Sequence, residues 1–197
     1  MPLGAFKAAL MGTAGVSTGD VVLLSSQTAS DSANLDFTSG IDSTYGEYIF
    51  KFYNINPATD QVNFVFQANA SGGSGFNETI TSTAFSAYHD EADTTTGLTY
   101  TGDRDQAQGT AYQQIGFFLG NESDKSVAGT LHLFNPSSTT YVKHFYSKAN
   151  RCDGSAAAYT GNDYAAGYIN TTAAIDEISF KMSSGNFDGK IKMWGVK

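Results

Sequence analysis

The strongest constraint on the fold is a strict alternation of apolar and polar residues over positions 174–197. Apolar side chains take every second position on both sides of a short loop: Ile178, Phe180, Met182, Ile191 and Met193. Because successive side chains of a strand point to opposite faces, each run has one apolar and one hydrated face. The loop between the runs is rich in Gly, Asn and Asp, which is typical of a turn between paired strands. We therefore expect 174–197 to form a terminal antiparallel hairpin.

The same pattern predicts strands in most of the chain. They are expected at 21–24, 35–37, 47–55, 62–68, 79–88, 111–119, 129–134, 141–147 and 168–170. Turn residues predict further hairpins over 47–68 and 129–147, and long polar loops are expected at 89–108 and 150–164. No long helical segment alternates with these strands. The pattern predicts an all-β, two-sheet antiparallel sandwich of jelly-roll or concanavalin-like topology.

The chain is expected to form one sandwich domain over 16–197, preceded by an N-terminal arm or short helix at 1–15. Leu3, Phe6 and Leu10 share one face at helical spacing. An isolated helix of this length is marginal in water, so it needs a surface to pack on. That surface is either its own domain or a neighbouring subunit. We expect these three residues to bind a partner, in a homo-oligomer for which a trimer is favoured.

Composition restricts the classes of partner. The chain has 197 residues and a net charge of −8, which disfavours binding to nucleic acid because phosphates are repelled. No run approaches the roughly 18 apolar residues that span a bilayer, so no membrane association is expected. Cys152 is the only cysteine, which excludes an internal disulfide and suits assembly in a reducing cytoplasm.

No residue pattern predicts a reaction. Glycosidases need two carboxylates flanking the bond that breaks, whereas the adjacent Asp176 and Glu177 point to opposite faces of a strand. Cys152 has no catalytic motif around it. We expect no catalytic residue, no cofactor and no enzymatic activity.

Metal and sugar sites have weaker signals. His132 and His144 can face each other across the 129–147 hairpin, but two histidines without further ligands do not make a zinc site, and His89 is remote. Acidic loop residues could hold Ca²⁺ or simply be solvated: Asp90, Glu91, Asp93, Asp103 and Asp105. We expect no metal site. Some aromatic residues could stack on a glycan or instead pack in the core or an interface: Tyr45, Tyr100, Tyr159, Tyr164 and Trp194.

Several segments resemble small virion proteins of tailed bacteriophages, especially phages of aquatic bacteria. They are the opening MPLGAFKAALMG, the stretch beginning YIFKFYNINPATDQVNFVFQANASGG, the segment GTLHLFNPSSTTYVKHFYS and the closing YINTTAAIDEISFKMSSGNFDGKIKMWGV. The resemblance covers most of the chain but rests on strands and turns. It implies a non-enzymatic protein of the virion that decorates or stabilises the capsid, assembled in the host bacterial cytoplasm. Its implied partners are the major capsid protein or other virion proteins. The alternative is a tail-fibre or receptor-binding module that recognises host surface glycans.

Overall fold

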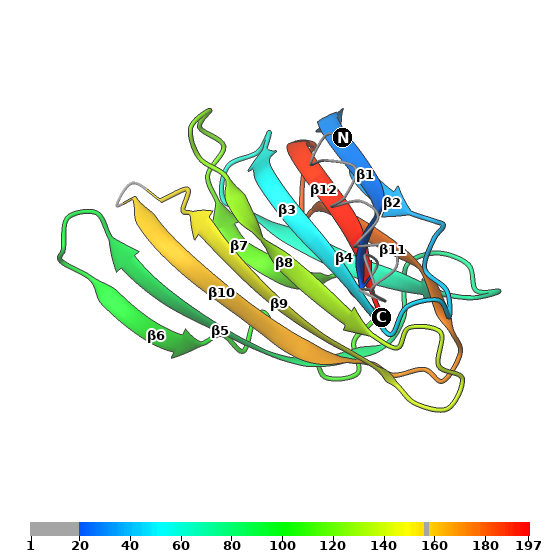
Figure 1. Ribbon diagram of the computed structural model, residues 1–197. Coiled ribbons are helices and arrows are strands. Elements are labelled where there is room, and N and C mark those ends of the chain that lie inside the picture. Colours follow the sequence, from blue (N-terminus) through cyan, green and yellow to red (C-terminus); the bar gives the residue numbers. More distant parts are fainter. Residues whose placement is uncertain (1–19, 156–157) are drawn as a thin grey trace, which may run out of the picture.

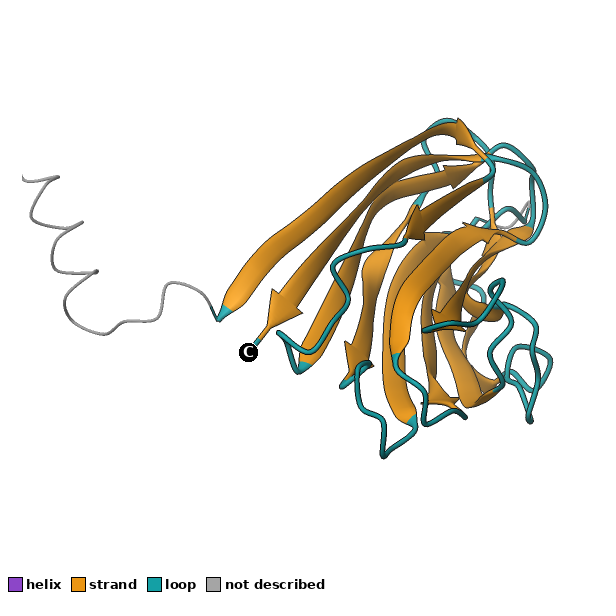
Figure 2. Ribbon diagram, turned by 90° about the vertical axis from the view of Figure 1, so that its right-hand side faces the viewer, coloured by secondary structure: helices purple, strands orange, loops and turns teal. Residues whose placement is uncertain are grey.

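The computed structural model describes residues 20–155 and 158–197, and in this part of the chain only strands, turns and loops occur (Figures 1 and 2). The proposed partner-binding residues Leu3, Phe6 and Leu10 lie outside the described residues. The strands are β1 (Val21–Ser32), β2 (Asn34–Phe37), β3 (Glu47–Pro57), β4 (Val62–Ala70), β5 (Ile80–Asp90), β6 (Thr96–Tyr100), β7 (Gln113–Leu119), β8 (Val127–Phe134), β9 (Lys143–Cys152), β10 (Tyr159–Ile169), β11 (Ile175–Met182) and β12 (Phe187–Val196).

The strands form two antiparallel sheets of unequal size. The large sheet has eight strands in the order β1-β12-β3-β8-β9-β10-β5-β6, and the small sheet has four in the order β2-β11-β4-β7. In Figure 1 the small-sheet strands β4, β7 and β11 lie behind the large sheet. This arrangement confirms the predicted two-sheet antiparallel sandwich.

Two of the three predicted hairpins are wrong. In the terminal segment β11 pairs with β2 and β4, whereas β12 pairs with β1 and β3, so the turn between them crosses from one sheet to the other. The segment 47–68 behaves in the same way, because β3 belongs to the large sheet and β4 to the small one. In both segments, the two consecutive strands lie in different sheets and turn their apolar faces toward the space between the sheets. Alternation fixes which face is buried, but it does not tell whether consecutive strands pair or face each other. The predicted hairpin over 129–147 is confirmed as the pair β8 and β9.

Two predicted loops contain strand. β10 begins at Tyr159, inside the expected loop 150–164, and β6 lies inside the expected loop 89–108. The inner face of β10 carries Gly161 and Asp163 where a core strand normally has large apolar residues. A strand whose buried face is polar has no hydrophobic alternation, so its sequence looks like a loop.

The core centres on Phe180 of β11. Its ring lies between 5.2 and 6.3 Å, centre to centre, from five other phenylalanine rings: Phe37, Phe50, Phe52, Phe64 and Phe66. These rings come from both sheets and join the two layers. The eight residues that the pattern places in the core are all buried: Phe50, Phe52, Phe64, Phe66, Leu131, Leu133, Phe180 and Ile191.

The outer surface of the small sheet is covered by loops. Gln67 of β4 is fully buried, and its side-chain amide donates hydrogen bonds to the backbone carbonyls of Glu78 and Ala111, at 3.0 and 2.9 Å. The hydroxyl of Tyr112 lies 3.2 Å from that of Ser179, which is also buried. These contacts place the segments before β5 and before β7 over the small sheet.

The segment between β6 and β7 closes one side of the sandwich. Ile80 exchanges two backbone hydrogen bonds with Gly109, and the N–H of Ser82 donates to the carbonyl of Gln106 at 2.9 Å. The segment therefore continues the pairing of β5 where β6 has ended, and then leads into the small sheet. The predicted long polar loop thus has a structural role.

Candidate functional site

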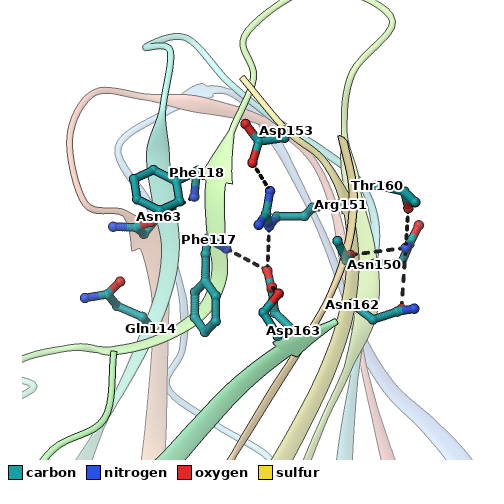
Figure 3. Close-up of polar contacts among 12 residues, drawn as sticks. Asn63, Gln114, Phe117, Phe118, Asn150, Arg151, Asp153, Thr160, Asn162 and Asp163 are labelled. Carbon is teal, nitrogen blue, oxygen red and sulfur yellow. Dashed lines mark hydrogen bonds and ion pairs between the residues drawn. The ribbon is translucent and has the colours of Figure 1, made fainter. Parts of the chain in front are cut away.

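A buried charged cluster lies between the sheets, at one end of β9 and β10 (Figure 3). Arg151 of β9 pairs in register with Gly161 of β10, and its guanidinium group passes over this glycine. A Cβ atom at Gly161 would lie 2.8 Å from the central guanidinium carbon, so the approach requires glycine. Nε of Arg151 donates to Oδ2 of Asp163 at 2.9 Å, and Nη1 donates to Oδ2 of Asp153.

Asp163 is the most deeply buried member of this cluster. Its Oδ1 accepts a hydrogen bond from the hydroxyl of Ser86 at 2.7 Å, and its Oδ2 accepts the backbone N–H of Phe117 at 2.9 Å. Burial raises the pKa of the Asp163 carboxyl, while Arg151 and the hydrogen-bond donors oppose that rise. Because Phe117 belongs to the small sheet, the carboxylate ties the two sheets together. Its two oxygens accept hydrogen bonds from three donors, so the carboxylate has a structural role: it links the two sheets.

A pocket of about 270 Å³ adjoins this cluster. Arg104 lies along one wall, with its guanidinium carbon 4.3 Å from the ring centre of Phe118. Its Nη1 donates to the side chain of Gln114 at 2.7 Å, and its Nε lies 3.2 Å from a carboxylate oxygen of Asp103. Both arginines of the pocket, Arg104 and Arg151, are therefore engaged by acidic or amide partners. The pocket carries no unbalanced positive charge that would select an anion.

The second candidate is the outer face, which we define as the face of the large sheet turned away from the small sheet. Figure 1 looks onto this face. Cross-strand partners lie on the same face of a sheet, so the pairing registers assemble its side chains into rows. The aromatic row runs from β1 to β5: Leu23, Trp194, Ile49, His132, Tyr146, Ala166 and Thr83. The lysine row runs from β1 to β6: Ser26, Lys192, Lys51, Thr130, Lys148, Tyr164, Phe85 and Tyr100.

A third row on the outer face, the asparagine row, is interrupted by a bulge in β3. It contains Thr28, Lys190, Tyr53, Ala128, Asn150, Asn162, Ala87 and Leu98. Asn150 donates from its side chain to the hydroxyl of Thr160 at 3.0 Å and reaches Asn162 at 3.4 Å, which Figure 3 shows beside the buried cluster. Together the three rows form a polar, aromatic surface that spans the whole sheet.

The histidines do not form one site. The ring of His132 stacks on Tyr146, with centres 4.4 Å apart, and its Nδ1 lies 2.5 Å from a carboxylate oxygen of Glu47. His144 packs instead against Tyr168, at 6.1 Å between ring centres. The expectation that the two face each other is therefore wrong, because the register of β8 and β9 places Tyr146 opposite His132.

The acidic loop residues also have separate roles. Asp90 accepts the N–H groups of Thr94 and Thr95 and closes the turn after β5. Asp103 lies beside Arg104, and Asp105 accepts a hydrogen bond from the hydroxyl of Tyr100. Asp93 contacts His89 at 3.2 Å, and Glu91 lines a surface pocket beside the half-buried thiol of Cys152. Across residues 20–155 and 158–197, no three His, Cys, Asp or Glu side chains gather closely enough to hold a metal ion.

Three of the five candidate aromatic residues share the outer face, namely Tyr100, Tyr164 and Trp194. Tyr45 instead packs against the core and covers Gly195, and Tyr159 packs edge-on against Tyr88. The sequence pattern does not single out the lysines that accompany the aromatic residues of the outer face. Lys190 and Lys192 alternate with core residues in the sequence, but only the register reveals that Lys51 and Lys148 lie in the same row as Lys192.

Comparisons of the chain with protein-family models, with curated proteins and with solved structures found no match. In the described ranges, no helix is long and apolar enough to cross a membrane.

Proposed function

We propose that this chain is a non-enzymatic structural protein of a tailed-bacteriophage virion, which decorates or stabilises the capsid. The observation that carries the proposal is the outer face, which extends over all eight strands of the large sheet and which no other segment of residues 20–155 and 158–197 covers (Figure 1). A decorating protein is expected to present a broad surface, whereas an enzyme concentrates reactive groups in a cleft. The charged cluster in the interior is a tie between the sheets. The resemblance of the chain to small phage virion proteins supports the same function.

Attachment to the particle is assigned to the N-terminal arm with Leu3, Phe6 and Leu10. The outer face carries several lysines, which are depleted in the centres of protein–protein interfaces. We therefore expect the outer face to be exposed to solvent on the particle and not to be buried against the capsid. Weak contacts of the arm with the major capsid protein are multiplied in a homo-oligomer, and a closed trimer is the favoured form.

The first test is the location of the protein in the particle. Purified particles are labelled with an antibody to this chain and imaged by negative staining. Labels distributed over the capsid support the proposal, and labels confined to the tail or its fibres contradict it.

The second test removes residues 1–12 from the protein. We expect the truncated chain to keep the unfolding midpoint of the full chain and to lose occupancy on particles. If the truncation unfolds the domain and the oligomeric state has no effect on attachment, the arm is part of the core and the proposal for it is wrong.

A tail-fibre or receptor-binding module remains the second candidate function. The specific observation in its favour is the exposure of aromatic side chains on the outer face, with Phe85 41% and Tyr100 58% exposed. Label at the tail tip, together with loss of adsorption to host cells in a Tyr100→Ser variant, would favour this candidate over decoration.

A further inference from the structure

The outer face concentrates positive charge on an acidic protein. The three rows defined above contain four lysines and no Asp or Glu, although the whole chain has a net charge of −8. One carboxylate of the same face, that of Glu47, lies beside the aromatic row and is engaged by His132. The four lysines are Lys51, Lys148, Lys190 and Lys192. None of them forms an ion pair within the described ranges. Their ammonium groups are thus available to a partner of opposite charge.

Two of these lysines line a depression at one end of the face. Lys190 and Lys192 surround a hollow of about 400 Å³ together with Tyr53, Asn54 and Thr28. The ammonium group of Lys192 lies 5.4 Å from the ring centre of Tyr53. Asn54 has a positive φ of 50° at the bulge of β3, which turns the chain beside the hollow. The hollow offers two cations, an aromatic ring, an amide and a hydroxyl to one ligand.

Flat aromatic surfaces lie farther along the lysine row. The rings of Phe85 and Tyr164 are stacked, with centres 4.7 Å apart and planes inclined by 9°. Phe85 is 41% exposed, and the ammonium group of Lys148 lies 5.6 Å from the centre of the Tyr164 ring. In the aromatic row, Tyr146 is 44% exposed and stacks on His132. Along the lysine row, three lysines are therefore followed by three aromatic rings: Tyr164, Phe85 and Tyr100.

We infer that the outer face binds an acidic polysaccharide, whose carboxylate or sulfate groups pair with the lysines and whose sugar rings lie against the exposed aromatic side chains. Lys51 and Lys148 are two strands apart, which corresponds to about 10 Å. Duplex DNA carries a charge about every 1.7 Å along its axis, a much denser array than these lysines can match. An acidic polysaccharide carries its charges more sparsely, on an uncharged chain of rings. The row of lysines and aromatic rings fits that pattern.

A second protein molecule fits this face less well. A protein interface would bury four ammonium groups, and a buried charge without a partner is costly. A hydrated polymer leaves each ammonium group in contact with water while it pairs with an anion. This inference does not depend on where in the virion the protein lies.

The test measures binding of the full chain to immobilised polygalacturonate and dextran sulfate, with uncharged dextran and oligo(dT) as comparison ligands. We expect binding to the two acidic polymers that weakens as salt is raised, and little binding to uncharged dextran. The double variant Lys51→Gln/Lys192→Gln is expected to weaken binding about tenfold or more, which corresponds to the loss of two contacts of moderate strength.

The matched control is Lys181→Gln/Lys197→Gln, which removes the same charge outside the three rows. We expect it to change affinity less than about threefold, a small effect on the logarithmic scale of affinity. Equal weakening by both double variants would show a non-specific charge effect and overturn the inference. Tighter binding of oligo(dT) would assign the face to nucleic acid, and lysine-dependent self-association without polysaccharide binding would assign it to a second copy.

A conservative variant separates folding from binding. Lys51→Arg/Lys192→Arg keeps both charges and is expected to retain binding within about threefold. Loss of binding in this variant with an unchanged unfolding midpoint would contradict a role for charge. Failure of polysaccharide binding, with particles still labelled over the capsid, would overturn this inference and leave the proposed virion function standing.

Discussion

Replacing Asp163 by Asn tests whether the buried charged cluster holds the two sheets together. The carboxylate accepts three hydrogen bonds, from Ser86, from the backbone N–H of Phe117 and from Arg151, and its side chain is fully buried. An amide keeps the shape but removes the charge that balances Arg151 and directs one N–H group toward a donor. Breaking a buried ion pair by removing one partner costs about 3–5 kcal/mol. Since Arg151 keeps its contact with Asp153, we expect a loss of about 3 kcal/mol, at the lower end of this range.

The free energy of unfolding can be measured by urea titration, with the single tryptophan, Trp194, as the fluorescent probe. For a slope of about 2 kcal/mol per molar urea, a loss of 3 kcal/mol lowers the midpoint by about 1.5 M. The matched control is Asp103→Asn, which also removes a carboxylate beside an arginine but whose side chain is 72% exposed. We expect the control to cost less than about 1 kcal/mol, as is usual for surface pairs. If Asp163→Asn costs no more than Asp103→Asn, the cluster does not tie the sheets.

Three further changes test the core, the turn after β5 and the sheet packing. Phe180→Ala removes the ring at the centre of the core and should lower the unfolding free energy by about 3–5 kcal/mol in the same titration; a loss below about 1 kcal/mol would contradict the described packing. The hydroxyl of Thr94 and the N–H groups of Thr95 and Thr94 lower the pKa of Asp90. The ionised carboxylate therefore stabilises the fold at pH values above the ordinary pKa of an aspartate. This stabilisation is lost as the pH falls through the lowered pKa of the folded state. An acid titration of Asp90→Asn should therefore show a stability deficit at neutral pH that shrinks in acid, and a constant deficit would refute this role. Gly129→Ala should lower the unfolding free energy by about 1–3 kcal/mol, because the new Cβ would lie 2.3 Å from a backbone carbonyl oxygen of β9. Gly46→Ala is the control: its Cβ would have its nearest atom at 4.0 Å, so thermal unfolding measured in parallel should show little effect.

Most of the strands and the core could be predicted from the sequence because one physical signal determines both. Where a strand buries large apolar residues, as β3 and β11 do, alternation identifies the strand and its buried face. The signal fails for β10, whose buried face carries Gly161, Asp163 and Ala165. There the burial of the strand is made possible by hydrogen bonds and an ion pair with residues far away in the sequence, including Phe117. No local pattern records those partners.

The pairing of strands is the second feature of the fold that the sequence does not predict. A run of alternating residues followed by a turn and another such run satisfies both a hairpin within one sheet and a crossing between two sheets. β8 and β9 follow the first arrangement, and β11 and β12 follow the second. The outer face depends on this information, since Lys51 and Lys192 become neighbours only because β3 pairs with β12. Its individual residues are evident in the sequence, but their assembly into rows requires the register.

The unequal widths of the two sheets explain why the interior is polar at one end. At a strand spacing of about 4.8 Å, eight strands span roughly 34 Å and four strands only about 14 Å. The inner surface of the large sheet near β5 must therefore be closed by a loop, whose backbone groups need partners once they are buried. Gln113 and Ser82 supply them: the amide of Gln113 donates to the carbonyl of Arg104 at 2.9 Å, and Ser82 accepts the N–H of Gln106 at 2.9 Å. One loop closes this side of the sandwich, and other loops cover the small sheet. Among the described residues, no comparable segment covers the outer face, so its lysines and aromatic rings are accessible to a partner.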